Sequence, residues 1–324
     1  MEKKIKHSFI TLVVPAYNEQ KVLPDFHARS SKVLNDLPIE YEILYINDGS
    51  QDKTVDVIKE LREKDEHVSV VDLSRNFGKE IALTAGLDHA KGDAVIVIDA
   101  DLQDPPELIP QLVSKWQEGY DVVYAKRIAR EGETWFKKMT SYLFYRFIQR
   151  LSSVHIPEDV GDYRLISRRA LDALLALRER HRFMKGLFAW VGFPQVAVPY
   201  HRGPRAAGET KWNYWKLWNF ALEGITSFTT KPLKLASYLG LCIAFLSFIF
   251  GSYIIYDKLV HGNPVPGYPS LMVVILFIGG LQFIILGIMG EYLARTFSET
   301  KNRPLYLVKE YSPSDSTDKG EDKV

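Results

Sequence analysis

The sequence predicts an α/β protein with a Rossmann-like, mostly parallel sheet, amphipathic interface helices and two C-terminal transmembrane helices. Between Phe9 and Ala125, short apolar runs alternate with amphipathic stretches. This alternation is typical of a parallel sheet that helices cover on both faces. Nearer the C-terminus, two long segments contain no charged residue, and each is long enough to cross a bilayer. These two observations define the expected fold class.

Nine elements are expected in the first part of the chain. The strands are predicted at Phe9–Val14, Glu42–Ile46, Val68–Leu73, Ala94–Ile98 and Asp121–Tyr124. The helices between them are predicted at Glu19–Leu37, Asp52–Glu66, Lys79–Lys91 and Pro106–Glu118, with glycines as C-terminal stops after the last two. The run Val95–Ile98 has no polar residue on either face, so we expect a buried central strand there.

Two later stretches combine aromatic and basic residues, Trp135–Arg150 and Trp212–Phe228. Helices of this composition either lie at a membrane surface or pack on the sheet. The first stretch leaves both interpretations open. The second precedes the predicted spans, which favours the membrane surface for it.

The predicted spans are Leu235–Tyr256 and Ser270–Gly290. Lysines and arginines flank the pair on its outer sides, which predicts that both termini and the α/β domain are cytoplasmic. The expected parts are a cytoplasmic domain (1–200), a juxtamembrane segment that binds the acceptor (201–232), a transmembrane hairpin (233–295) and a cytoplasmic tail (296–324). Within that tail, the polar end Ser312–Val324 is expected to be disordered.

The composition excludes several classes of protein. A formal net charge of +1 gives no global field that would attract nucleic acid. The single cysteine, Cys242, excludes an intramolecular disulfide framework. The basic start of the chain is followed by too short an apolar run for a signal peptide. Glycines in the second span permit close approach of helices, so a homo-oligomer is expected.

The most informative stretch is Val95–Asp104, where an apolar strand ends in Asp99 and Asp101. Ligands of doubly wound sheets bind beyond the carboxyl ends of the strands. Two carboxylates there suit Mg²⁺ or Mn²⁺ bridging a diphosphate. The alternative is that these residues terminate the strand and cap the helix that begins at Pro105–Pro106.

Three other strand ends carry polar groups. Tyr17 and Glu19 follow the first strand and are candidates to stack on a base and to bind a ribose, although Asn18 and Glu19 also suit a helix start. Asp48 follows the second strand and is a candidate acceptor for a pyrimidine N–H, whereas Asp52 is expected to cap the next helix. The turn Ser74–Lys79 adds two cations. Neither G-x-G-x-x-G after the first strand nor a Walker A sequence occurs, so a metal is the remaining means of holding phosphate.

Together these motifs resemble the inverting, GT-A-fold glycosyltransferases of family 2. The resemblance rests on Val14–Glu19, Asn47–Thr54 and Asp99–Glu107, and it extends from about Phe9 to Pro304. More narrowly, the chain resembles the polyprenyl-phosphate glycosyltransferases of the dolichyl-phosphate mannose synthase-like group, in the bacterial bactoprenol glucosyltransferase branch. This resemblance implies a nucleotide-sugar donor such as UDP-glucose, a divalent metal (Mg²⁺ or Mn²⁺), undecaprenyl phosphate as acceptor and a multi-pass location in the bacterial plasma membrane.

The resemblance also assigns roles to residues. Those for the nucleotide sugar are Pro15, Tyr17, Glu19, Asp48, Lys79, Asp99, Ala100, Asp101 and Gln103. Asp99 and Asp101 are the expected metal ligands, and Asp101 is also expected to be a catalytic residue. Within Gly161–Arg168, Asp162 is the candidate catalytic carboxylate, with Glu158 and Asp159 as rivals and pairing with Arg164 or Arg168 as the structural alternative. The candidate ligands of the acceptor phosphate are Arg127, Arg164, Arg205 and Lys211.

Three alternatives stay open at this stage. A processive polysaccharide synthase would share the donor site, but no Gln-x-x-Arg-Trp occurs, since Leu151 follows Gln149–Arg150. Transfer of mannose or an aminoarabinose-type sugar would retain every motif. A non-catalytic membrane scaffold or lipid-flipping subunit is the third, and the presence of Asp99, Asp101 and Asp162 argues against it.

Overall fold

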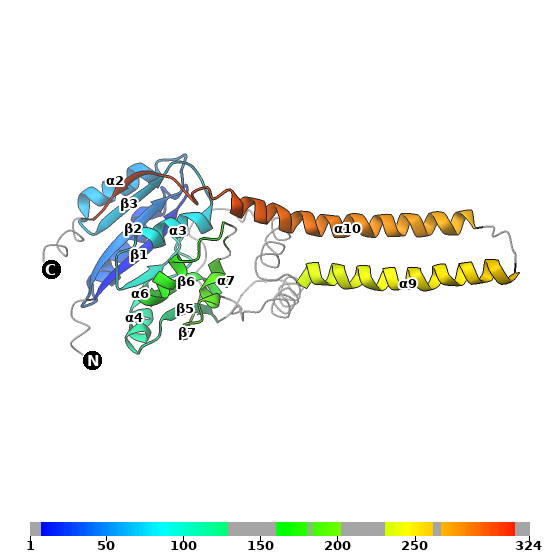
Figure 1. Ribbon diagram of the computed structural model, residues 1–324. Helices are drawn as coiled ribbons and strands as arrows, with labels where there is room; N and C mark the ends of the chain where they lie inside the picture. Colours follow the sequence, from blue (N-terminus) through cyan, green and yellow to red (C-terminus); the bar gives the residue numbers. More distant parts are fainter. Residues whose placement is uncertain are drawn as a thin grey trace.

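The structure is a computed structural model, and it describes residues 8–128, 160–180, 182, 184–201, 231–261 and 267–314. Figure 1 shows an α/β domain and, separate from it, a pair of long helices. The helices α9 (Lys231–His261) and α10 (Tyr268–Thr300) run antiparallel and project away from the domain.

One eight-stranded sheet forms the centre of the domain, in the order β7-β5-β6-β4-β1-β2-β3-β8. The strands are β1 (Phe9–Ala16), β2 (Glu40–Asn47), β3 (Val68–Leu73), β4 (Ala94–Val97), β5 (Val122–Arg127), β6 (Val160–Ser167), β7 (Gln195–Tyr200) and β8 (Val308–Ser312). β6 and β8 pair antiparallel with their neighbours, and every other pairing is parallel. The sheet is therefore mostly parallel, as predicted.

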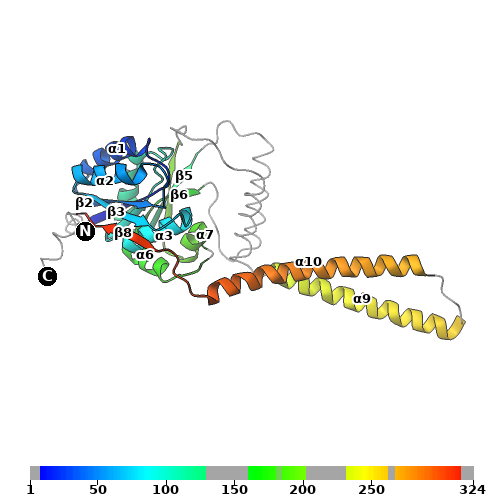
Figure 2. The same cartoon turned by 90° about the horizontal axis from the view of Figure 1, so that it is seen from above.

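Helices cover both faces of this sheet (Figure 2). They are α1 (Leu23–Asn35), α2 (Thr54–Lys64), α3 (Lys79–His89), α4 (Ile109–Gln117, preceded by the short 3₁₀ helix η2, Pro106–Leu108), α6 (Arg168–Leu175) and α7 (Met184–Trp190). α1, α2 and α4 bury their apolar residues in one core, and α3, α6 and α7 bury theirs in the other.

The alternation of side chains along the central strands explains the two cores. On β1, Leu12 and Val14 belong to the first core and Val13 belongs to the second. On β2, Tyr45 belongs to the first core and Leu44 to the second. Successive strand residues point to opposite faces, so a strand that is apolar throughout is buried on both sides.

The nine elements predicted between Phe9 and Ala125 are all present; β3 has the predicted ends, and the other elements are shifted at one end or both. The largest shift is in α1, which begins at Leu23 and not at Glu19. Pro24 lies in its first turn, where proline is favoured, and Asn18 has a left-handed φ of 57° that no helix start adopts. The alternative interpretation, in which Asn18 and Glu19 start this helix, is therefore wrong, and its N-cap is Val22.

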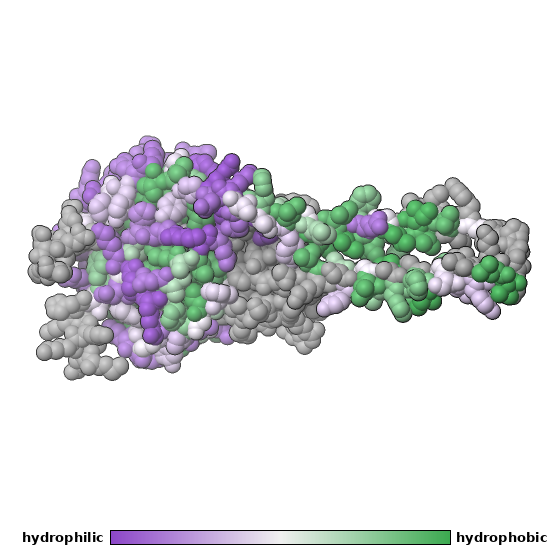
Figure 3. Space-filling view, viewed as in Figure 1, coloured by the Kyte–Doolittle hydropathy of each residue, from purple (hydrophilic) through white to green (hydrophobic). Residues whose placement is uncertain are grey.

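The two long helices cover the two predicted spans and extend beyond them. Their surface is mainly hydrophobic, in contrast to the α/β domain (Figure 3). Among the described residues, one stretch is long and apolar enough to cross a membrane, Val273–Thr300 in α10. The apolar stretch of α9, Tyr238–Tyr253, is shorter. One of the two predicted spans thus meets this criterion, and the span in α9 is not confirmed.

After α10 the chain returns to the domain, where a tail was expected. β8 pairs antiparallel with β3 at the edge of the sheet. Lys59 on α2 forms an ion pair with Glu310 on β8, with 2.7 Å between Nζ and Oε2. Ser314, which was expected in the disordered end, is 2 % exposed. The residues beyond it lie outside the described part of the chain.

Candidate functional site

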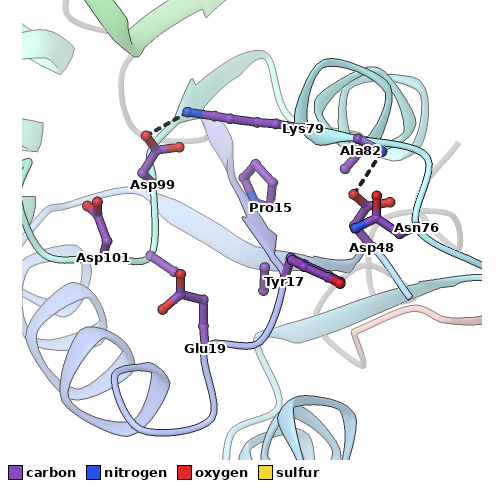
Figure 4. A pocket seen from close by; sticks show the side chains of 12 residues that line it. Pro15, Tyr17, Glu19, Asp48, Asn76, Lys79, Ala82, Asp99 and Asp101 are labelled. Atoms are coloured by element: carbon purple, nitrogen blue, oxygen red, sulfur yellow. Dashed lines mark hydrogen bonds and ion pairs between the residues drawn. The ribbon is translucent and has the colours of Figure 1, made fainter. Parts of the chain in front are cut away.

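The carboxyl ends of β1, β2 and β4 and the start of α3 line one cavity of about 380 Å³ (Figure 4). Parallel strands bring these ends to the same edge of the sheet, which is where ligands of such folds bind. All the predicted nucleotide-sugar residues except Gln103 line this cavity: Pro15, Tyr17, Glu19, Asp48, Lys79, Asp99, Ala100 and Asp101. Asn76, Gly78, Ala16 and Ala82 complete the lining.

Gln103 occupies a different position from the one expected. Its side chain is buried, and its backbone N–H donates to Oδ1 of Asp101 at 3.1 Å. The intervening Leu102 has a φ of 58°. Gln103 therefore takes part in a tight turn that orients Asp101, and it does not line the cavity.

Lys79 connects two of the predicted acidic residues. Its Nζ lies 2.7 Å from Oδ2 of Asp99, just beyond β4, and 2.7 Å from Oδ2 of Asp162 on β6. The Asp162 side chain is 14 % exposed, and no hydrogen-bond partner is found for its buried Oδ1 in the described structure. The side chain of Asp162 thus pairs with Lys79, which lines the cavity of Figure 4. It does not form the ion pair with Arg164 or Arg168 that the structural alternative supposed.

These contacts set the pKa values of the three groups. Burial opposes ionisation of Asp162, but Lys79 and Lys185 outweigh it and lower the pKa of Asp162 to about 2. Burial raises the pKa of Asp99, and Lys79 opposes that rise. Burial disfavours the charge of Lys79, yet the two carboxylates raise its pKa above the ordinary value. Asp162 is therefore a fully ionised carboxylate of low basicity.

Asp48 holds the loop that leads into α3. Its Oδ1 accepts the N–H of Phe77 at 2.7 Å, and its Oδ2 accepts the N–H of Gly78 at 3.0 Å. The following Gly49 has a φ of 62°, and a Cβ there would lie 2.3 Å from the backbone carbon of Arg75. This close approach requires glycine. Since a carboxylate can accept about four hydrogen bonds, Asp48 retains capacity for a ligand.

Side chains of the first two strand-end loops bind each other's backbone. Asn18 accepts the N–H of Gln51 at 2.9 Å, and the hydroxyl of Thr54 accepts the N–H of Glu19 at 2.9 Å. Asp52 accepts the N–H of Thr54 at 3.0 Å, but the N-cap of α2 is Lys53, so the prediction that Asp52 is the helix cap is wrong by one position. The polar residues of both motifs therefore serve largely to fix the loops that carry Tyr17, Glu19 and Asp48.

Arg164, predicted as a phosphate ligand, is 4 % exposed. Its Nη2 donates to the carbonyl of Gly161 at 2.8 Å, and its guanidinium carbon lies 3.8 Å above the ring of Phe188 on α7. Burial lowers the pKa of Arg164 to about 10. Arg164 supports the backbone next to Asp162 from inside the protein and is not placed to receive a ligand from solvent.

Arg127, at the end of β5, is half-buried. Its Nε donates to the hydroxyl of Tyr200 at 3.3 Å, and that hydroxyl donates to Oδ1 of the buried Asp104. Gly161 lies against the same guanidinium, since a Cβ there would be 3.2 Å from Nη2 of Arg127. Arg127 is thus next to the strand that carries Asp162, although it does not line the donor cavity.

Two charged residues near Asp162 were not singled out from the sequence. Burial, reinforced by the charge of Asp162, raises the pKa of Glu80 on α3 to about 7. Burial lowers the pKa of Lys185 on α7, and Asp162 opposes that change. Glu80 directly follows Lys79, a predicted site residue, so its position in the sequence could have indicated that it lies near the site. Lys185 is brought near by α7, an element that the sequence did not predict.

Several predicted residues lie outside the described part of the chain. They are Arg205, Lys211, Glu158 and Asp159, together with both aromatic-basic stretches. Their predicted roles remain predictions.

The carboxylate oxygens that line the cavity suit a divalent cation whose remaining ligands would come from the phosphates of a substrate. Within the described residues, no group of three or more His, Cys, Asp or Glu side chains is placed to hold a metal. Asp99 and Asp101, however, lie together on one wall of the cavity (Figure 4). Mg²⁺ is commonly bound by one or two carboxylates plus substrate phosphates, and Mn²⁺ prefers the same oxygen ligands.

Comparison with known families and proteins gives matches along almost the whole chain. The model of glycosyl transferase family 2 matches residues 11–175, and the model of the GtrB C-terminal hairpin matches residues 231–296. Among solved structures, a glucosyl-3-phosphoglycerate synthase from Mycobacterium tuberculosis aligns over 68 % of this chain and 78 % of that chain, with 21 % identity and a TM-score of 0.47. This last similarity is distant.

Curated relatives are much more similar in sequence. An uncharacterized glycosyltransferase of Synechocystis sp. is 55 % identical over 92 % of this chain and 94 % of its own length. A prophage-derived bactoprenol glucosyl transferase of Shigella flexneri is 51 % identical over 93 % of this chain and 97 % of its own. A prophage bactoprenol glucosyl transferase homolog of Escherichia coli is 49 % identical over 93 % and 98 %.

Proposed function

This chain belongs to glycosyl transferase family 2, and on that basis we propose that it transfers glucose from UDP-glucose to undecaprenyl phosphate at the cytoplasmic face of a bacterial plasma membrane. The observation that carries this proposal is the meeting of Asp99 and Asp162 at Lys79, with Asp101 lining the same cavity as Asp99, at one edge of the sheet. The relatives named bactoprenol glucosyl transferases support the choice of sugar and lipid. Such a reaction needs a sheet that carries an acidic site and a segment that reaches the lipid. The match to the GtrB C-terminal hairpin supports the second of these.

The donor nucleotide would occupy the cavity between β1 and β2. Tyr17 is 42 % exposed, so its ring is accessible for stacking on a base. Asp48 is fixed by two backbone N–H groups and has lone pairs left for a donor on the base. Glu19 lines the same cavity and would accept a hydrogen bond from the ribose. Pro15 and Ala100 contribute apolar walls.

Asp99 and Asp101 would hold a divalent cation together with the diphosphate of the donor. Such a cation, when bound, stabilises the negative charge that develops on a leaving diphosphate. Asp101 is oriented for this role by the N–H of Gln103. Lys79, which lines the same cavity, would bind an oxygen of the diphosphate.

Asp162 would orient the attacking phosphate of the lipid and stabilise positive charge on the sugar. A phosphate monoester has a second pKa near ~6, so the acceptor is largely dianionic at neutral pH and needs little deprotonation. The pKa of about 2 makes Asp162 a poor base, which agrees with an orienting role. A single displacement from the face opposite the diphosphate would invert the anomeric carbon.

The acceptor is insoluble in water, and the helices α9 and α10 would place the domain at the membrane that holds it. We propose that both cross the bilayer, because the flanking lysines and arginines lie on the domain side of the pair. Arg127, Arg205 and Lys211 would then bind the phosphate headgroup near the surface. Holding both reactants at one site supplies a large part of the rate enhancement of a two-substrate reaction.

Topology is tested with single cysteines in a Cys242→Ala background. A cysteine in the loop between α9 and α10 should react with a membrane-impermeant maleimide added outside intact cells. A cysteine at the C-terminal end should react only after the cells are opened. Labelling of the loop from inside would overturn the two-span arrangement.

The reaction is tested with purified full-length protein in detergent, undecaprenyl phosphate and radiolabelled UDP-glucose, UDP-galactose or GDP-mannose. We expect lipid labelling from UDP-glucose that EDTA abolishes and that Mg²⁺ or Mn²⁺ restores. Asp99→Asn should be inactive, while Asp25→Asn, on the exposed side of α1, should retain activity. Labelling from another donor alone would keep the mechanism and change the sugar. Absence of labelling from every donor would favour the non-catalytic scaffold.

A further inference from the structure

The side chain of Lys79 occupies the position of a cation between two acidic strand ends. Its ammonium group is 2.7 Å from Asp99 and 2.7 Å from Asp162, which come from different strands, and its side chain is 47 % exposed at the cavity. An ammonium group has three donors, so it satisfies both carboxylates at once. We propose that Lys79 is a resident counter-ion, which holds Asp99 and Asp162 until a metal-bound nucleotide replaces it.

The local position of Lys79 argues for such a role. Lys79 is the first residue of α3, directly after the N-cap Gly78. The N-terminal end of a helix carries partial positive charge, so a lysine there is unfavourable unless other groups stabilise it. Asp99 and Asp162 provide that stabilisation. In return, Lys79 reduces the repulsion between carboxylates that are crowded at one site.

The same contacts make Lys79 a competitor of the metal. Asp99 is a proposed metal ligand, and its Oδ2 is already bound to Nζ of Lys79. A divalent cation arriving alone must displace this ion pair and leave Lys79 with Asp162 only. A cation arriving with a nucleoside diphosphate brings new anionic oxygens, to which Lys79 can transfer. Metal and nucleotide should therefore bind together, and metal alone should bind weakly.

The exchange also changes the state of Asp162. When Lys79 moves to the diphosphate, Oδ2 of Asp162 loses its ion pair, and Oδ1 has no hydrogen-bond partner in the described structure. Oδ2 is then open to the next ligand, whereas Oδ1 stays buried. Donor binding would thus release Oδ2 of the carboxylate that orients the acceptor. This inference rests on the proposed metal site and deepens it.

The test measures binding of Mn²⁺ to the full-length protein in detergent, by the loss of the electron paramagnetic resonance signal of free Mn²⁺. Wild type, Lys79→Met, Lys79→Gln and Lys79→Arg are compared with and without UDP. Lys79→Gln keeps hydrogen-bond donors without charge and serves if the methionine variant folds poorly. Lys115→Met is the matched control, because Lys115 forms an ion pair with Glu118 on α4, outside the site.

In the absence of UDP, we expect Lys79→Met and Lys79→Gln to bind Mn²⁺ more tightly than wild type does, by about tenfold at least. UDP should tighten Mn²⁺ binding strongly in wild type and much less in these variants. Lys79→Arg and Lys115→Met should resemble wild type.

Two results would overturn the inference, and they are distinguishable. If wild type binds Mn²⁺ with UDP but neither neutral variant binds Mn²⁺ alone more tightly, the counter-ion role is wrong and the metal site stands. If no form binds Mn²⁺ even with UDP, the metal site itself is wrong and the counter-ion role falls with it.

Discussion

The backbone N–H of Ser314 donates to the hydroxyl of Ser69 at 2.9 Å, across 245 positions of the sequence. That hydroxyl in turn donates to Oε2 of Glu42, whose Oε1 accepts the hydroxyl of Thr11 at 2.6 Å. Glu42 is 1 % exposed. A chain of buried hydrogen bonds therefore connects the segment after α10 to three adjacent strands, β3, β2 and β1.

Replacing Ser69 with alanine should destabilise the domain. Both the N–H of Ser314 and the carboxylate of Glu42 lose a partner in a buried place, which costs about 1–3 kcal/mol for each unsatisfied group. We expect a lower midpoint of thermal unfolding in detergent, read by tryptophan fluorescence. Ser114→Ala, on the exposed side of α4, is the control and should change nothing. An unchanged midpoint in Ser69→Ala would show that water replaces the lost partners.

Substitution of Arg164 separates a supporting role from phosphate binding. Arg164→Met keeps the length of the side chain but loses the bond to Gly161 and the contact with Phe188. We expect a loss of about 2 kcal/mol in stability and a reduced kcat, because Asp162 is no longer held in place. The KM for the lipid should change little. A large rise in that KM at unchanged stability would restore the phosphate role. Arg29→Met, at an exposed ion pair with Glu107, is the control.

Asp162→Asn should reduce kcat about a hundredfold or more, since a carboxylate that orients the acceptor and stabilises charge is lost. The KM for the donor should not rise, because Asp162 does not line the cavity and its neutralisation leaves Lys79 more available to the diphosphate. With a pKa of about 2, Asp162 remains ionised throughout, so its protonation should cause no loss of wild-type activity above about pH 4. Asp172→Asn, on the exposed side of α6, is the control. A donor KM that rises with an unchanged kcat would contradict the assignment.

Tyr200→Phe should weaken the support of Arg127. The hydroxyl of Tyr200 links Arg127 to the buried Asp104, and its removal leaves both with one contact fewer. We expect a loss of about 1–3 kcal/mol in stability, measured by thermal unfolding. If Arg127 binds the acceptor phosphate, the KM for the lipid should also rise. Tyr120→Phe, where no hydroxyl contact is found in the described structure, provides the comparison.

Glu80 should make stability depend on pH near neutrality. Its pKa is raised from 4.5 to about 7, so between these values the folded state binds a proton that the unfolded state releases. The free energy of unfolding of wild type should therefore fall as the pH rises through this window. Glu80→Gln removes the effect, so the variant should gain on the order of 1 kcal/mol over wild type at pH 8 but little at pH 5. Equal gains at both pH values, or none in either, would contradict this. Glu60→Gln, on the exposed side of α2, is the control.

The first half of the fold could be predicted because its signals are local. β1 to β4 are mainly apolar on both faces, and the helices between them are amphipathic, so period and length identify each element. The donor cavity followed from the same pattern, since the ends of parallel strands meet at one edge. Tyr17, Asp48, Asp99 and Asp101 needed no knowledge of distant pairing.

The later strands could not be predicted in this way. β6 contains Gly161, Asp162 and a buried arginine, so its composition does not indicate a central strand. β7 contains Pro199, which is tolerated because the strand lies at the edge of the sheet. β8 is polar and pairs with β3 after more than half of the chain has intervened. The ion pair of Lys79 with Asp162 depends on the position of β6, so it could not be predicted from the sequence either.

The two strands at the outer edges of the sheet, β7 and β8, are also the two between which α9 and α10 are inserted. The chain leaves the domain from one edge and comes back to the other, so the helical pair is attached to the domain at two separated points. A domain joined by one linker can swivel about it, whereas two attachments on opposite sides remove most of that freedom. With the pair crossing a bilayer as proposed above, the distance and tilt of the cavity edge relative to the membrane would be set by the fold itself.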